Sequence, residues 1–147
     1  MSKEDKKRTF IFIDGSDYDN YKELKETHYF KSKKNIDLFL CTTLIGIFCV
    51  KEPMKLDNSS KKDYIRVNDN QRNDAMPILK SLAISAYGDV NVLSDEDKMF
   101  GYCEDYANAG IKQLYSWYKD PAFEFDTILA KELLNCWKSI DLKLFEE

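Results

Sequence analysis

The residues best suited to chemistry in this chain are aspartates that follow a short apolar segment. Thr9–Ile13 is β-branched and aromatic, which predicts a strand. Asp14 comes directly after it, with Asp17 and Asp19 close behind. Carboxylates are the ligands that Mg²⁺ prefers in enzymes that cut nucleic acids. This pattern supports one hypothesis, a Mg²⁺-dependent nuclease built on Asp14. The plainer alternative is a strand that ends in an Asp–Gly turn.

The rest of the sequence lacks the spacings that other catalytic sites need. His28 is the only histidine, which excludes a metal site made of several histidines. No phosphate-binding glycine loop, dinucleotide-binding motif or serine-hydrolase elbow is present. The stretch 69–74 resembles a calcium-binding loop but lacks the central glycine and the final glutamate. We therefore expect no catalytic residue, no metal site and no cofactor, with Asp14 as the remaining enzyme alternative.

Charge is divided unevenly along the 147 residues. Lys and Arg number 22 against 26 Asp and Glu, and this net charge of −4 argues against a dedicated nucleic-acid binder. Residues 1–62 nevertheless carry +3, and residues 63–147 carry −7. The basic half could contact phosphate, so a nucleic-acid-binding module is a second hypothesis, beside an ordinary solvated surface. Its candidate contacts are Lys31, Lys33, Lys34, Lys51, Lys55, Lys61 and Lys62.

Hydrophobic spacing predicts a mainly α fold of the α+β class, with one globular domain at 9–147 behind a charged tail at 1–8. The segment 36–50 is apolar nearly all round, which is typical of a buried central helix. Gly46 within it would let a neighbouring helix approach closely. Further helices are expected at 76–87, 95–118 and 124–139. The two- or three-stranded sheet would use Thr9–Ile13, Tyr64–Val67 and, as a third strand, Val90–Leu93.

Capping signals set the expected helix ends. Gly88 lies where a glycine ends the helix at 76–87, and Asp74 is positioned to cap its start. Ser94 is the expected cap of the helix at 95–118, whose first turn is acidic and favours the positive end of the helix dipole.

The helix expected at 95–118 carries an apolar stripe that core packing explains best. Aromatic residues make up 14% of the chain. The tyrosines on this helix have acidic neighbours, which favours packing in the core or in a protein interface over stacking on bases. Beside the stripe lies a polar cluster that we expect to bind a partner protein. Its members are Glu104, Asp105, Asn108 and Lys112.

Gly88–Asp97 and Tyr106–Leu114 together resemble a small protein family encoded beside the genes for DNA phosphorothioation, the fourth of the Dnd system-associated families. The matching residues are Gly88, Asp89, Val90, Leu93, Asp95, Glu96, Tyr106, Ala107, Asn108, Gly110 and Ile111. The resemblance implies a setting in anti-phage defence linked to DNA modification, and it brings no catalytic residue. Phe10–Gly15 also resembles the first strand of PIN or NYN nucleases, whose alternating strands and helices the rest of this chain lacks.

The leading hypothesis combines this setting with the aromatic content and the missing catalytic motifs. We expect a non-enzymatic accessory or adaptor protein that binds a larger defence protein, an ATPase or a nuclease subunit, with DNA contact as an open alternative. No apolar run is long enough to span a bilayer, the chain opens with polar and basic residues, and the four cysteines form no C-x-x-C pair. We therefore expect a cytoplasmic protein with reduced thiols and no membrane contact.

Overall fold

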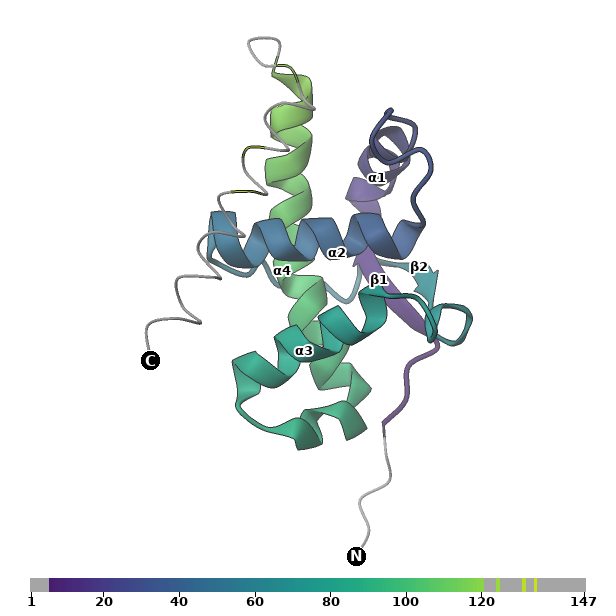
Figure 1. Ribbon diagram of the computed structural model, residues 1–147, viewed down its shortest axis with the longest axis vertical. Coiled ribbons are helices and arrows are strands. Elements are labelled where there is room, and N and C mark those ends of the chain that lie inside the picture. Colours follow the sequence, from purple (N-terminus) through teal and green to yellow (C-terminus); the bar gives the residue numbers. More distant parts are fainter. Residues whose placement is uncertain (1–5, 121–123, 125–130, 132–133, 135–147) are drawn as a thin grey trace, which may run out of the picture.

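The computed structural model describes residues 6–120 together with Glu124, Lys131 and Leu134. Over these residues the chain is mainly helical with a small antiparallel sheet, which confirms the expected fold class (Figure 1). The elements, in chain order, are β1 (Phe10–Asp14), η1 (Gly15–Asp17), α1 (Tyr18–Lys25), α2 (Asn35–Ile45), η2 (Gly46–Val50), β2 (Lys61–Arg66), η3 (Asn68–Asn70), α3 (Ala75–Tyr87), η4 (Val90–Ser94) and α4 (Glu96–Lys119).

The core is organised around α2 and α4, which cross at a steep angle (Figure 1). The two helices touch through their backbones. A Cβ atom built on Gly46 would lie 1.9 Å from the carbonyl oxygen of Tyr106, and one on Gly110 would lie 1.7 Å from that of Thr42. Neither position therefore accepts a side chain. The prediction that Gly46 permits close approach of a neighbouring helix is confirmed.

The two strands form an antiparallel ribbon that packs on the core with one face. Ile11 and Ile13 of β1 and Ile65 of β2 are buried, and Ile11 pairs with Ile65 across the ribbon. The register shifts between Ile11 and Phe12, so that Phe12 pairs with Asp63. Because side chains alternate along a strand, Phe10 and Phe12 lie on the opposite, outer face.

The segment predicted as a third strand, Val90–Leu93, is instead part of the 3₁₀ helix η4, so this prediction is wrong. Asp89 begins this turn, because its carboxylate accepts the backbone N–H of Asn91 at 2.9 Å. The preceding stop is as expected. Gly88 adopts a left-handed conformation with φ of 65° and donates its N–H to the carbonyl of Ile84.

One expected N-cap is wrong by one residue, and the other lies at the predicted position without making a side-chain capping bond. Asp95 caps α4, and its carboxylate accepts the backbone N–H of Lys98, whereas the Ser94 hydroxyl donates back into η4. Asp74 lies at the N-cap position of α3 as expected, but its side chain makes no capping bond, and the side chain of Asn73 accepts the N–H of Ala75 instead. Aspartate, asparagine and serine all cap turns, so a run of them leaves the choice to the local backbone.

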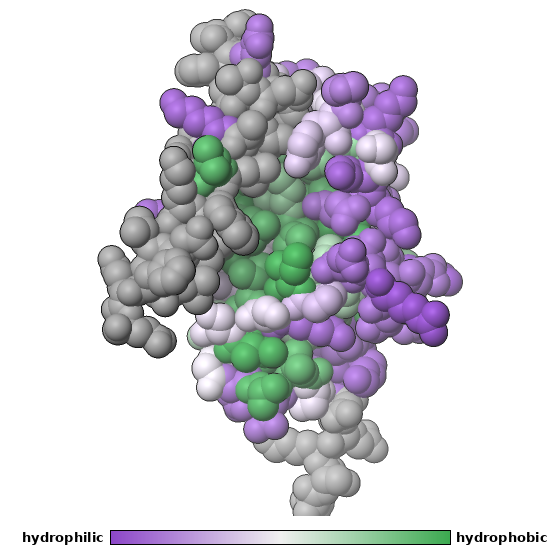
Figure 2. All heavy atoms as spheres, in the orientation of Figure 1, coloured by the Kyte–Doolittle hydropathy of each residue, from purple (hydrophilic) through white to green (hydrophobic). Residues whose placement is uncertain are grey.

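The face shown in Figure 2 has hydrophobic residues gathered over parts of α2 and α3, with hydrophilic residues on the side of α1. Ile78 of α3 is 45% exposed. The helix predicted at 124–139 lies almost entirely outside the described residues. Within the described part of the chain, no helix combines the length and the hydropathy needed to cross a membrane.

The helix crossing generates a direct test with three glycine variants. Gly46→Ala or Gly110→Ala should lower the free energy of unfolding by about 3 kcal/mol or more, because the helices must separate. Gly101→Ala is the control, since a Cβ at Gly101 meets nothing within 4 Å. It should stabilise the protein by about 0.5–1 kcal/mol through helix propensity. Urea unfolding measures all three, and equal effects at Gly101 and Gly110 would contradict the crossing.

Candidate functional site

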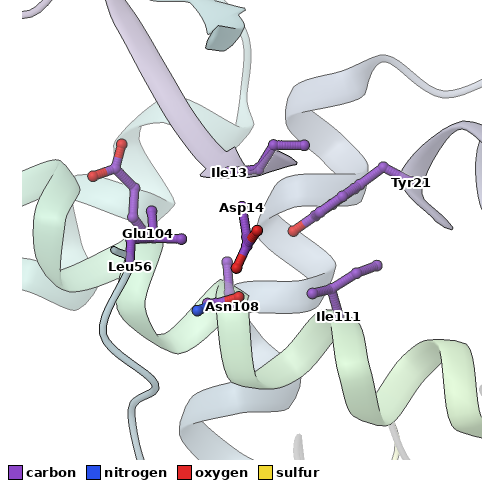
Figure 3. A pocket seen from close by; sticks show the side chains of 8 residues that line it. Ile13, Asp14, Tyr21, Leu56, Glu104, Asn108 and Ile111 are labelled. Atoms are coloured by element: carbon purple, nitrogen blue, oxygen red, sulfur yellow. The ribbon is translucent and has the colours of Figure 1, made fainter. Parts of the chain in front are cut away.

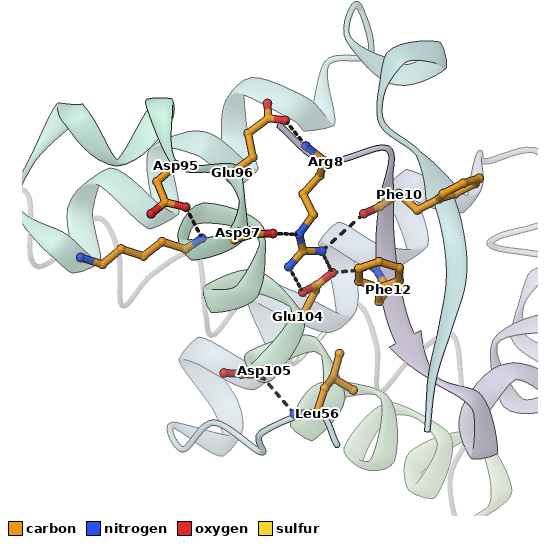
Figure 4. A network of polar contacts seen from close by, with 10 residues as sticks. Arg8, Phe10, Phe12, Leu56, Asp95, Glu96, Asp97, Glu104 and Asp105 are labelled. Atoms are coloured by element: carbon orange, nitrogen blue, oxygen red, sulfur yellow. Dashed lines mark hydrogen bonds and ion pairs between the residues drawn. The ribbon is translucent and has the colours of Figure 1, made fainter. Parts of the chain in front are cut away.

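A buried ion pair joins α4 to the segment before β1 (Figure 4). The Arg8 guanidinium donates to the two carboxylate oxygens of Glu104 at 2.8 and 3.0 Å and to Asp97 at 2.6 Å. Glu104 also accepts the backbone N–H of Phe12 at 2.6 Å, and the backbone N–H of Arg8 donates to Glu96 at 2.7 Å. These bonds fasten the free edge of β1 to α4.

Residues 6–8, which the sequence analysis included in a charged tail, are held by this network. The Lys6 N–H donates to the carbonyl of Ser94, and the Lys6 carbonyl accepts the N–H of Glu96. Residues 1–5 of the predicted tail lie outside the described residues. The segment before β1 is therefore part of the folded unit from Lys6 onward.

Burial dominates the electrostatics of the pair. The side chain of Glu104 is 2% exposed and that of Arg8 is 10% exposed. Burial raises the pKa of Glu104, and this outweighs the opposing effects of Arg8 and of the Phe12 N–H. Burial alone would lower the pKa of Arg8, but the carboxylates of Glu104 and Asp97 raise it overall. Each charge thus depends on its partner, and loss of either leaves the other buried and unpaired.

The loop between α2 and β2 is tied to the same side of α4. The Asp105 carboxylate accepts the backbone N–H of Leu56 at 3.2 Å, and the Asp105 carbonyl accepts that of Met54 at 2.9 Å. The amide of Asn108 donates to the Met54 carbonyl at 2.9 Å. Polar side chains beside the apolar stripe therefore satisfy the backbone of a loop that has no regular secondary structure.

All four residues predicted to bind a partner make contacts within the chain. Lys112 donates to the side-chain oxygen of Asn108 at 2.7 Å and to Asp17, at the start of α1, at 2.9 Å. Glu104 and Asn108 are buried, whereas Asp105 and Lys112 keep part of their surface. The partner contact stays a prediction for this cluster. The surface that it would need lies mainly at Asp105 and Lys112.

An open groove of about 410 Å³ runs beside Asp105, and we name it the tyrosine groove. A Cβ at Gly101 would point into open space, so this glycine leaves part of the groove unfilled. The groove is lined by Pro53, Tyr87, Asp97, Lys98, Gly101, Tyr102, Asp105 and Tyr106. Sequence analysis had placed Tyr102 and Tyr106 in a core or an interface, but it did not identify Tyr87 or Gly101 as lining residues.

The three tyrosines of the groove pack on one another. Tyr102 stands between Tyr87 and Tyr106, with ring centroids 6.0 and 5.0 Å away, and both pairs meet edge to face. The Lys98 ammonium lies 4.6 Å from the centre of the Tyr87 ring. Burial raises the pKa of Tyr87, and it raises the pKa of Tyr102 to about 12. Both phenols therefore keep their protons, and with them their ability to donate hydrogen bonds, at neutral pH.

A polar hollow of about 260 Å³ adjoins the groove and shares Asp97, Gly101 and Asp105 with it. Its remaining lining residues are Arg8, Lys55, Leu56, Asn58, Lys61 and Glu104. Two of the seven lysines predicted to contact nucleic acid thus line one hollow. The other five lie elsewhere along the chain: Lys31, Lys33 and Lys34 before α2, Lys51 after η2, and Lys62 on β2.

Asp14, the proposed centre of a nuclease, caps the 3₁₀ turn η1. Its carboxylate accepts the N–H and the hydroxyl of Ser16 at 2.9 and 2.8 Å. It points between Tyr21 and Asn108 into a space too small for a water molecule (Figure 3). In the described part of the chain, no group of three or more His, Cys, Asp or Glu could hold a metal ion. The Mg²⁺ nuclease stays a prediction.

Comparisons with protein-family models, with curated proteins and with solved structures found no match for this chain. The resemblance to the Dnd-associated family therefore rests on the sequence residues alone. Several of these residues have structural tasks here. Gly88 ends α3, Gly110 permits the helix crossing and Asn108 holds the loop before β2.

The buried ion pair makes Arg8→Met a sharp test. The variant keeps an apolar stem but leaves Glu104 buried without its cation, so the free energy of unfolding should fall by about 3–5 kcal/mol. Arg66→Met is the matched control, because Arg66 and Asp69 are 4.0 Å apart and 60% and 70% exposed. Its effect in urea unfolding should stay below about 1 kcal/mol. Equal losses would contradict the role given to Arg8.

The pKa of Glu104 predicts how stability depends on pH. Its folded pKa lies above the ordinary 4.5, so the folded state binds this proton more tightly than the unfolded state does. The contribution of Glu104 to stability then falls as the pH rises from the unfolded pKa through the folded pKa. The free energy of unfolding of the wild type, minus that of Glu104→Gln, should therefore decrease from pH 4.5 towards neutrality. Urea unfolding over this range tests it. A difference that increases with pH would show that Arg8 lowers the pKa instead.

Proposed function

We propose that the protein is an accessory protein that acts by binding a larger protein through the tyrosine groove. The proposed setting is the one that the resemblance implies, an anti-phage defence system linked to DNA phosphorothioation. The partner would be an ATPase or nuclease subunit of that system. The observation that carries the proposal is the groove, an open aromatic recess on the outer side of the longest described helix.

Exposed apolar side chains near the groove support a protein partner. Tyr87, in its wall, is 41% exposed, and Met54, which follows the lining residue Pro53, is 44% exposed. Val90, at the start of η4 just beyond Gly88, is 61% exposed. Tyrosine and methionine are enriched in protein interfaces, where rigid aromatic side chains supply most of the binding energy.

The groove is also held in shape before any partner arrives. Asp105 and Asn108 bind the loop that carries Pro53, and Tyr102 packs against Tyr87 from α3. A preformed recess reduces the entropy that binding must overcome. The groove can therefore receive a side chain of the partner with little rearrangement.

The charges at the rim indicate what the partner presents. Asp97 and Asp105 lie two helical turns apart on either side of Gly101, and the Asp97 side chain is 60% exposed. The phenol groups of Tyr87 and Tyr102 add hydrogen-bond donors. An apolar or aromatic anchor flanked by a basic residue would match this surface.

Two variants at one position test the proposal. Gly101→Gln places a long side chain in the groove, whereas Gly101→Ala leaves most of the space open, and both suit a helix. The tagged wild type and Gly101→Ala, expressed in the native host, should capture a protein encoded in the phosphorothioation gene cluster. Gly101→Gln should lose that protein while its unfolding midpoint in urea stays at or above the wild-type value.

Two results would contradict the proposal. In the first, the wild type captures no protein from that cluster, which removes the defence setting. In the second, Gly101→Gln captures the same partner as Gly101→Ala, which removes the groove as the contact but leaves the adaptor role in place.

A further inference from the structure

The outer face of the β1–β2 ribbon carries two aromatic rings outside the core. Phe10 and Phe12 alternate with the buried Ile11 and Ile13, and both rings are partly exposed. Neither belongs to the hydrophobic core cluster of the described residues. None of the residues that line the tyrosine groove lies on this face.

Cations lie over these rings. The Arg66 guanidinium is 5.5 Å from the centre of the Phe10 ring, and the Lys61 ammonium is 5.6 Å from that of Phe12. Lys62 pairs with the buried Ile13 and therefore belongs to the other face of the ribbon, where its ammonium is 3.9 Å from the centre of the Tyr18 ring. Arg66 is 60% exposed and its contact with Asp69 is long, at 4.0 Å. Such exposed cation–π contacts are weak, about 0.5–1 kcal/mol, so a stronger anionic ligand can replace them.

We propose that this face binds single-stranded nucleic acid. Bases would stack on Phe10 and Phe12, and Lys61 and Arg66 would move from ring contacts to phosphate contacts. Alternating aromatic and cationic groups are the pattern that single-strand binding uses, because every base has a π face and every linkage has a charge. The Arg8 guanidinium also lies over the Phe12 ring, 4.8 Å from its centre, and Glu104 holds it there, so a base would stack on the part of the ring that Arg8 leaves uncovered.

The spacing of the rings favours a single strand over a duplex. Side chains two residues apart on one face of a strand are about 7 Å apart. Stacked nucleotides on one strand of a duplex are about 3.4 Å apart. Neighbouring bases must therefore separate to lie on both rings, which a single strand permits and base pairing prevents. An acidic peptide could neutralise the cations, but its carboxylates offer nothing planar to cover the rings.

The test measures fluorescence anisotropy of a labelled oligothymidylate at low salt with the full chain. The wild type should bind it, with weaker binding to a duplex of equal length and to polyglutamate. Phe10→Leu with Phe12→Leu should weaken binding at least about fivefold without changing the salt dependence. Lys61→Gln with Arg66→Gln should weaken binding and reduce the slope of log K against log salt by about 1.4.

The matched control removes two cations from the segment before α2, as Lys31→Gln with Lys34→Gln, and should bind within about twofold of the wild type. Circular dichroism checks that each variant is folded. Ultraviolet cross-linking gives a second readout on the wild type, and the thymidylate adduct should lie on the peptide 9–14. Absence of binding, equal binding to polyglutamate or duplex, or unchanged binding by the phenylalanine variant would each overturn the proposal. Gly101→Gln should bind the oligothymidylate normally, which keeps this test separate from that of the groove.

Discussion

The contact on which the rest of the structure depends is the backbone-to-backbone crossing of α2 and α4. It requires glycine at Gly46 and Gly110, since a Cβ at either position would overlap a carbonyl group of the other helix. Because the two helices are in backbone contact, α2 lies at the centre of the core, and its apolar residues on all sides are suited to that place. One side of α4 packs in the same core. The remaining sides of α4 are then available for two other tasks, positioning neighbouring segments and forming the groove.

Polar residues on α4 carry out the first of these tasks. Arg8 and Glu104 hold the edge of β1, Asp105 and Asn108 hold the loop before β2, and Lys112 reaches the start of α1. These contacts also set the boundaries of the candidate surfaces. The loop forms one wall of the tyrosine groove, and the fastened strand presents its phenylalanines outward. This polar network thus shapes both candidate surfaces, and Asp105 belongs to the network and to the lining of the groove.

Periodic and local features were predictable from the sequence. The all-round apolar segment at 36–50, the stripe of α4 and the stop at Gly88 each follow from the spacing of side chains along one element. Long-range pairing was not predictable, because Arg8 and Glu104 are 96 residues apart and a charged N-terminal residue resembles a solvated tail. The groove was not predictable for the same reason, because its lining residues come from α3, α4 and a loop, which are separated along the sequence. A polar residue beside an apolar stripe can face water or a loop, and only the tertiary structure decides which.

The central claim is that a protein partner binds at the tyrosine groove, and site-specific photo-cross-linking tests it most directly. A photoreactive phenylalanine analogue in place of Tyr87 should cross-link the partner when cells of the native host are irradiated. The same analogue in place of Tyr29 is the matched control, because Tyr29 is equally exposed, at 43% against 41%, and lies beside α2 away from the groove. The account predicts an adduct from the Tyr87 position alone. An adduct from the Tyr29 position alone would contradict it.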